Sequence, residues 1–78
     1  MRYLVVNENM DNGELLDFGK RRIEAHGAFQ AFKTKGLRAA IIFVSGQYYW
    51  IDNGSLCRQR YSWNEVEQVL KAFGIQRR

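Results

Sequence analysis

The chain has 78 residues, of which 46% are hydrophobic and 14% aromatic, and its formal net charge is +4. This length and hydrophobic content exclude a multidomain protein and a disordered chain, so we treat residues 1–78 as one small basic domain with a core of marginal size. The single cysteine excludes an internal disulfide, and the apolar runs are too short to span a membrane. We therefore expect a cytoplasmic protein without a membrane contact.

The N-terminal half predicts a strand followed by a helix. Residues 3–6, with the sequence YLVV, indicate a short buried strand. A helix start follows, because Asp11 can cap a helix and Glu14, three residues later, completes a capping box. Over residues 15–32 the apolar side chains fall on one broad arc, which predicts an amphipathic helix. Gly36 is well placed as the residue just beyond its C-terminus.

The central stretch, residues 37–61, predicts three antiparallel strands joined by two tight turns. The Asn-Gly pair at 53–54 is a strong hairpin signal, since a type I′ turn needs positive φ at both central positions. That turn pairs Tyr49 with Arg58 on neighbouring strands. We place the preceding turn at the Ser-Gly pair, residues 45–46, in the same way.

Side chains alternate along these strands, so the sheet has two distinct faces. The first face holds more aromatic area, and we expect the helices to cover it; it carries Ala39, Ile41, Phe43, Tyr48, Trp50, Cys57, Gln59 and Tyr61. The second face carries Ala40, Ile42, Val44, Gln47, Tyr49, Ile51, Leu56, Arg58 and Arg60. Residues 38–44 are apolar without alternation, which indicates a central strand covered at least partly on both sides. The opposite assignment would make Tyr48, Trp50, Gln59 and Tyr61 the exposed surface.

The last helix has a clear start and end. Residues 62–65, Ser-Trp-Asn-Glu, form a capping box, apolar residues then repeat at helical spacing from Val66 to Phe73, and Gly74 ends the helix. The predicted order is β-α-β-β-β-α. It describes an α+β fold in which an antiparallel meander sheet of three or four strands is packed on one face by two helices. The first strand pairs in parallel beside the 38–44 strand or lies along the far edge.

No stretch carries a catalytic or metal-binding signature. His26 is the lone histidine and has no acidic or thiol partner fixed nearby in the sequence, and Cys57 is expected in mid-strand opposite Trp50. Spacings typical of metal ligands and glycine-rich phosphate loops are absent. We therefore expect a protein that is not an enzyme and that uses no metal, cofactor or small-molecule substrate.

The second face predicts a binding surface for nucleic acid. There Tyr49 lies beside Arg58 and Arg60, and an aromatic ring with arginines on an open sheet can stack single-stranded bases while holding phosphates. Further cations could extend this surface, namely Lys20, Arg21, Lys33 and Lys35. The positive net charge agrees with an anionic partner.

A protein-interaction module is the alternative hypothesis. Ile42, Ile51 and Leu56 with Tyr49 would form the apolar centre of an interface on the second face, with the arginines as its rim. Such a surface could form a homodimer or block a macromolecule, as small inhibitors encoded by phages and mobile elements do; this analogy rests on size and on the missing catalytic signature. Binding that weakens steeply with salt would favour nucleic acid over a protein partner.

Overall fold

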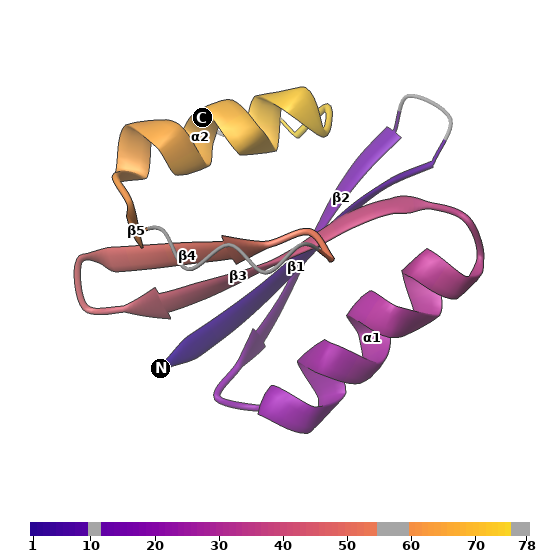
Figure 1. Ribbon diagram of the computed structural model, residues 1–78, viewed down its shortest axis with the longest axis horizontal. Helices are drawn as coiled ribbons and strands as arrows, with labels where there is room; N and C mark the ends of the chain where they lie inside the picture. The colour runs from indigo at the N-terminus through magenta and orange to yellow at the C-terminus, as the bar shows by residue number, and fades with distance from the viewer. Residues whose placement is uncertain (10–11, 55–59, 76–78) are drawn as a thin grey trace.

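The computed structural model describes residues 1–9, 12–54 and 60–75. Its elements are β1 (Arg2–Asn9), β2 (Asn12–Gly19), α1 (Arg22–Thr34), β3 (Arg38–Ser45), β4 (Tyr48–Asp52), β5 (Arg60–Tyr61) and α2 (Trp63–Ala72). Within these residues the strands form one open antiparallel sheet in the order β2-β1-β3-β4-β5, and both helices pack on it (Figure 1). The predicted α+β class is confirmed. No helix of the described residues is long and apolar enough to cross a membrane.

The segment predicted to begin the first helix is instead a strand, β2, so α1 begins only at Arg22. Leu15 packs against the core beneath α2, whereas Leu16 pairs with Val5 on the opposite face of the sheet. Adjacent leucines therefore both find apolar neighbours, because both faces of this sheet are partly covered. The same leucines also fit one arc of a helix, and only pairing with β1 decides between the two structures. Asp11 lies outside the described residues.

The N-terminal cap of α2 and the glycines after both helices are where the sequence predicts them, whereas the predicted N-terminal cap of the first helix is wrong. The Ser62 hydroxyl accepts a hydrogen bond from the Glu65 amide at 3.3 Å, and the Glu65 carboxylate accepts one from the Ser62 amide at 2.8 Å, so the capping box is confirmed. Gly36 follows α1 with φ of 80° and Gly74 follows α2 with φ of 76°. Both glycines end their helices in the left-handed region, as expected.

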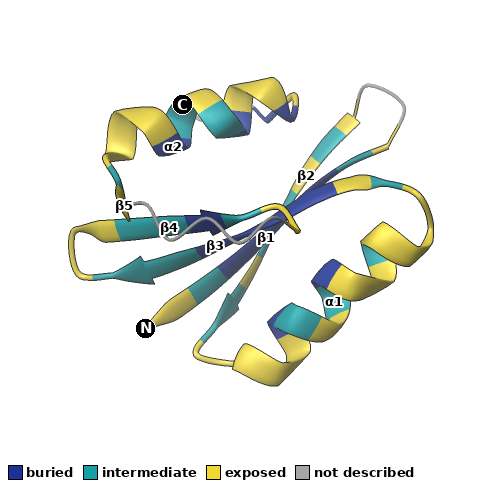
Figure 2. Cartoon of the chain, viewed as in Figure 1, coloured by how far each residue is buried: buried dark blue, intermediate teal, exposed yellow. Residues whose placement is uncertain are grey.

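The two helices lie on opposite faces of the sheet, so the prediction that both pack on one face is wrong (Figure 1). The core cluster on the α2 side consists of Leu4, Val6, Ala40, Ile42, Ile51, Val66, Leu70, Phe73 and Ile75. The cluster on the α1 side consists of Val5, Ala25, Phe29, Ala39 and Ile41. Figure 2 shows the buried residues of each helix turned toward the sheet. Successive apolar side chains of β1 and β3 point to opposite faces of the sheet, so one helix packs on each set. This confirms that residues 38–44 form a strand covered on both sides.

β1 lies beside β3, one of the two predicted positions, but the two strands are antiparallel. Leu4 pairs with Ile42 and Val6 pairs with Ala40. The reason is the additional strand β2, which reverses the chain direction before α1. The helical connection therefore joins β2 to β3, and β1 lies between them in the sheet.

The turn between β3 and β4 is displaced by one residue from the predicted position. Ser45 pairs with Tyr48, so the loop consists of residues 46–47. Gly46 has φ of 60°, and hairpin turns of the primed types need positive φ at this first loop position. The pairing moves by two residues along β4, so every side chain keeps its predicted face.

The pairing of β4 with β5 differs more. Tyr49 pairs with Tyr61 and Trp50 with Arg60, whereas the predicted turn would pair Tyr49 with Arg58. The register is shifted by three residues. Because three is an odd number, the side chains of Arg60 and Tyr61 lie on the opposite faces from those predicted. Tyr61 packs against the α2-side cluster immediately before the cap of α2. The predicted turn partners Ser55, Leu56, Cys57, Arg58 and Gln59 lie outside the described residues.

Candidate nucleic-acid interface

The face predicted to be open is covered by α2. Ile42 and Ile51 are only 0% and 8% exposed and belong to the core cluster beneath this helix. Tyr49 is partly buried against the same cluster. Leu56 and Arg58 lie outside the described residues. Ile42 and Ile51 therefore cannot form the centre of an exposed interface, because they are part of the core.

The exposed part of the sheet lies on the α1 side, at β4 and β5. Trp50 pairs with Phe43 of β3 and with Arg60 of β5, so these three side chains share one face. Phe43 packs against the α1-side cluster, which identifies that face. α1 packs mainly over β1 and β3, and Tyr48 of β4 remains 49% exposed. We refer to Tyr48, Trp50 and Arg60 as the aromatic–arginine strip.

The members of the aromatic–arginine strip contact one another. The Cζ atom of Arg60 lies 4.9 Å from the centre of the Tyr48 ring, a cation–π distance. The ring centres of Tyr48 and Trp50 are 6.4 Å apart, and the ring planes are tilted by 43°. Arg60 was predicted beside Tyr49, and the register places it over Tyr48 instead. The combination of an aromatic ring and an arginine on an exposed sheet face is thus present, but on the opposite face.

α1 concentrates positive charge on the same side of the sheet. Residues 20–35 contain five Lys or Arg and one Glu. The Nζ atom of Lys33 lies 3.2 Å from the carbonyl oxygen of Asn53, just after β4. Lys20 lines a shallow depression together with Gly46, in the turn just before β4. Lys33 of α1 therefore reaches the end of β4, and Lys20, in the turn before α1, faces the same depression as the turn that precedes β4.

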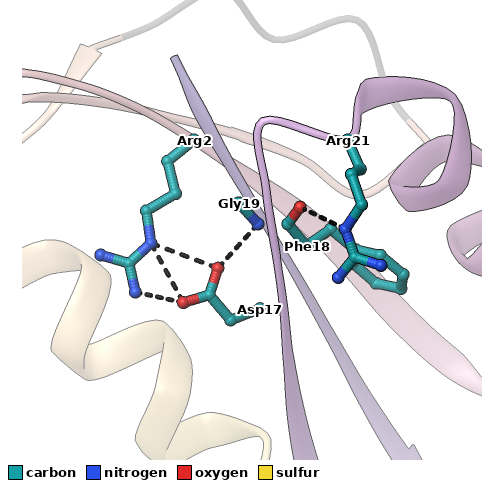
Figure 3. Close-up of polar contacts among 5 residues, drawn as sticks. All are labelled: Arg2, Asp17, Phe18, Gly19 and Arg21. Atoms are coloured by element: carbon teal, nitrogen blue, oxygen red, sulfur yellow. Dashed lines mark hydrogen bonds and ion pairs between the residues drawn. The ribbon is translucent and has the colours of Figure 1, made fainter.

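Arg2 lies on the α2 side of the sheet, because it pairs with Val44, which packs against the α2-side cluster, and it is engaged by an ion pair (Figure 3). Its guanidinium donates to both carboxylate oxygens of Asp17, with Nε at 3.2 and 3.1 Å from them. Asp17 also accepts a hydrogen bond from the Gly19 amide at 2.9 Å. The hydrogen bond from Arg2, followed by the one from Gly19, lowers the pKa of Asp17, and the same contact raises the pKa of Arg2. Arg2 is therefore not a free cation.

Arg21, a predicted site residue, is engaged as well. Its Nη1 atom lies 2.8 Å from a carboxylate oxygen of Glu24, and its Nε donates to the carbonyl oxygen of Phe18 at 3.0 Å (Figure 3). In the part of the chain that the structure describes, five cations of this side form no ion pair, namely Lys20, Arg22, Lys33, Lys35 and Arg60. These five are the charges available to an anionic ligand.

The α2 side has the opposite charge character. α2 contains two glutamates, Glu65 and Glu67, and one lysine, Lys71. Glu65 belongs to the capping box and lies at the helix N-terminus, where a negative charge is favourable. Arg2 and Arg38 also lie on the α2 side, but each is paired with a carboxylate. Among the described residues, cations without an ion pair are therefore concentrated on the α1 side, which favours the approach of a polyanion from that side.

His26 lies within an aromatic cluster. Its ring centre is 6.3 Å from that of Tyr3 and 5.8 Å from that of Phe43, and the residue is partly buried. Cys57 lies outside the described residues. Among the residues that are described, no group of three or more His, Cys, Asp or Glu side chains could hold a metal ion.

The chain matches no protein-family model, no curated protein sequence and no solved structure. The candidate site is therefore defined by the geometry and charge of this chain alone. Two of its residues, Tyr48 and Trp50, are predicted from the sequence only under the opposite assignment of the faces. The signal that favours this assignment is the apolar run at residues 38–44, which requires a cover on each side of the sheet.

Proposed function

We propose that this protein is a small, non-catalytic module that binds nucleic acid through the α1 side of its sheet. The observation that supports it most is the presence on one face of the aromatic–arginine strip and of a helix flanked by basic residues, of which Lys33 reaches the end of β4. Lysine and arginine hold phosphates, and exposed aromatic rings offer bases a surface for stacking. The net charge of +4 adds a long-range attraction for a polyanion.

Contacts with phosphates make the affinity sensitive to salt. Each phosphate neutralised by a lysine or arginine releases condensed counterions, so the association constant falls steeply as salt is added. Five cations of the α1 side are free of carboxylate partners among the described residues, namely Lys20, Arg22, Lys33, Lys35 and Arg60. We expect micromolar or weaker binding at physiological salt and clearly tighter binding at low salt.

A matched pair of charge reversals tests the proposal. Arg60→Glu and Lys71→Glu change the net charge equally at exposed positions, but Arg60 lies in the aromatic–arginine strip and Lys71 lies on α2, across the sheet. We expect Arg60→Glu to weaken binding to labelled oligonucleotides by about tenfold or more at low salt, and Lys71→Glu to weaken it only about twofold. Fluorescence anisotropy measures both affinities, and equal losses in the two variants would contradict the proposed surface.

A protein partner is the second candidate function, and the composition of the strip favours it. Trp, Tyr and Arg are the residue types enriched at the centres of protein interfaces. The originally expected apolar centre cannot serve this role, because Ile42 and Ile51 are buried beneath α2. A partner protein would bind with weak salt dependence and would depend on Trp50 more than on the lysines of α1. The salt titration of the wild-type protein separates the two functions.

A further inference from the structure

We infer that the nucleic acid bound by the α1 side is single-stranded and runs along β4, with neighbouring bases on Tyr48 and Trp50 and phosphates near Lys20 and Lys33. This inference rests on the proposed function and specifies its ligand. Three features carry it: the placement of the two rings, the positions of the two lysines, and the composition of the outer surface of α1.

The two rings are placed for two bases. Tyr48 and Trp50 are alternate residues of one strand, so their side chains leave the same face about 7 Å apart along it. Their ring centres are 6.4 Å apart and the planes are tilted by 43°, so the rings do not cover each other in parallel. The guanidinium of Arg60, which lies over Tyr48, adds a flat cationic group beside the two rings. Only a single strand can use these surfaces, because neighbouring pairs cover the base faces in a duplex.

The two lysines extend the rings into a linear path. β4 has five residues and is about 17 Å long, and α1, with 13 residues, is about 20 Å long. Lys20 lines the same shallow depression as Gly46, in the turn before β4, and Lys33 contacts Asn53 after β4. Cation, ring, ring and cation therefore follow one another along β4. This order suits a flexible strand whose phosphates flank its stacked bases.

The outer surface of α1 does not resemble that of a helix that reads a duplex. A recognition helix enters the major groove and contacts base edges and the flanking phosphates. Between the basic ends of α1, the exposed residues are Ile23, Glu24, Gly27, Gln30 and Ala31. This stretch has no cation, and its single charge is negative. The basic residues at the ends of α1 are therefore better placed to contact phosphates of a strand along β4 than phosphates beside the major groove of a duplex.

One carboxylate on the same face would repel the phosphates of a strand bound along β4. Removal of its charge should therefore strengthen binding, whereas the other substitutions weaken it. Asp52 pairs with Ile41, a residue of the α1-side cluster, and accepts a hydrogen bond from the Gly54 amide at 2.8 Å. Asparagine retains the acceptor oxygen and removes the negative charge. We expect Asp52→Asn to bind a single strand about two- to threefold more tightly than the wild type at low salt.

Two single-tryptophan proteins test the inference directly. Trp63→Phe leaves Trp50 as the only tryptophan, and Trp50→Phe leaves Trp63, which lies beside Tyr49 on the α2 side. Each protein is titrated at low salt with an oligothymidylate and with a DNA duplex of equal length. Tryptophan fluorescence and the anisotropy of the labelled oligonucleotide are recorded in the same samples.

We expect the oligothymidylate to quench Trp50 strongly and to leave Trp63 unchanged. The single strand should bind at least about tenfold more tightly than the duplex, and Tyr48→Ala should remove about tenfold of the single-strand affinity. The melting temperature of Tyr48→Ala should stay close to that of the wild type, because the side chain is half exposed. A normal melting temperature with reduced affinity shows that the ring acts in binding.

Three results would overturn parts of this account in distinguishable ways. Equal affinity for single strand and duplex, with unchanged Trp50 fluorescence, would overturn the single-strand inference and leave the proposed function standing. Quenching of Trp63 alone would place the strand on the α2 side and overturn the inference together with the proposed surface. Failure of both nucleic acids to bind at low salt would overturn the proposed function itself.

Discussion

Replacement of Ile42 by alanine tests whether the face of the sheet beneath α2 is covered, and the proposed position of the binding surface depends on that cover. Ile42 is 0% exposed in the core cluster beneath α2. Truncation of a fully buried isoleucine costs about 2–5 kcal/mol, from lost transfer free energy and from the cavity that remains. A domain of this size has a free energy of unfolding of only a few kcal/mol. Ile42→Ala should therefore remove most of the native stability, and Ile42→Val should cost about 1 kcal/mol.

The assay is urea denaturation followed by far-ultraviolet circular dichroism. The matched control is Ile23→Ala, which makes the same chemical change on α1 at a side chain that is 87% exposed. We expect the control to change the free energy of unfolding by less than about 0.5 kcal/mol, because little burial is lost and alanine favours the helix. If Ile42→Ala costs no more than Ile23→Ala, the face beneath α2 is open and the assignment of the site to the α1 side is wrong.

Three further predictions concern the fold. Gly13→Ala should lower the melting temperature, because the added Cβ atom would overlap the carbonyl oxygen of Phe73 after α2. Gly27→Ala, whose Cβ atom meets open space on α1, should stabilise the protein by up to about 1 kcal/mol. Destabilisation by both substitutions would contradict this packing. Ser62→Ala should cost about 1 kcal/mol in urea denaturation, through loss of the capping box. Asp17→Asn should slightly reduce the stability at pH 7. The pKa of the Asp17 carboxyl is lowered in the folded state, so the ionised carboxylate stabilises the fold above its unfolded pKa of about 4. This stabilisation is lost as the pH falls through the folded pKa. A stability difference from the wild type that grows below about pH 4 would refute this sign.

Elements fixed by local interactions were predictable from the sequence. The capping box at Ser62 needs only residues within one turn, and the glycines after both helices need only their own positive φ. The apolar run at residues 38–44 correctly indicated a central strand with cover on both sides. These features could be predicted because each depends on neighbours in the chain.

The strand β2 was missed because its pattern is ambiguous without its partner. Leu15 and Leu16 are adjacent, so they do not show the alternation of a strand with one buried face. Each meets a different side of the sheet once β1 and both helices are in place. The absence of alternation therefore came from two-sided burial, and the helical arc was a coincidence of spacing.

The site residues were partly predictable, and the missing information was the register. Arg60 was expected beside Tyr49, and the shift of three residues between β4 and β5 places it over Tyr48 on the opposite face instead. The register of these strands depends on the connection between them and on the packing of Tyr61 against the α2-side core. Lys20 and Lys33 were expected to extend the surface, and only the path of α1 shows that Lys33 reaches Asn53 after β4 while Lys20 faces the depression beside Gly46.

The most direct test of the central claim is amide chemical-shift mapping by NMR, with ¹⁵N-labelled protein titrated with an oligothymidylate at low salt. We predict that the largest shifts fall on β4 and on the residues around Lys20 and Lys33, while the amides of α2 stay unchanged. Largest shifts on α2, or no shifts along β4 at oligonucleotide concentrations that saturate binding, would contradict the assignment of the nucleic-acid surface to the α1 side of the sheet.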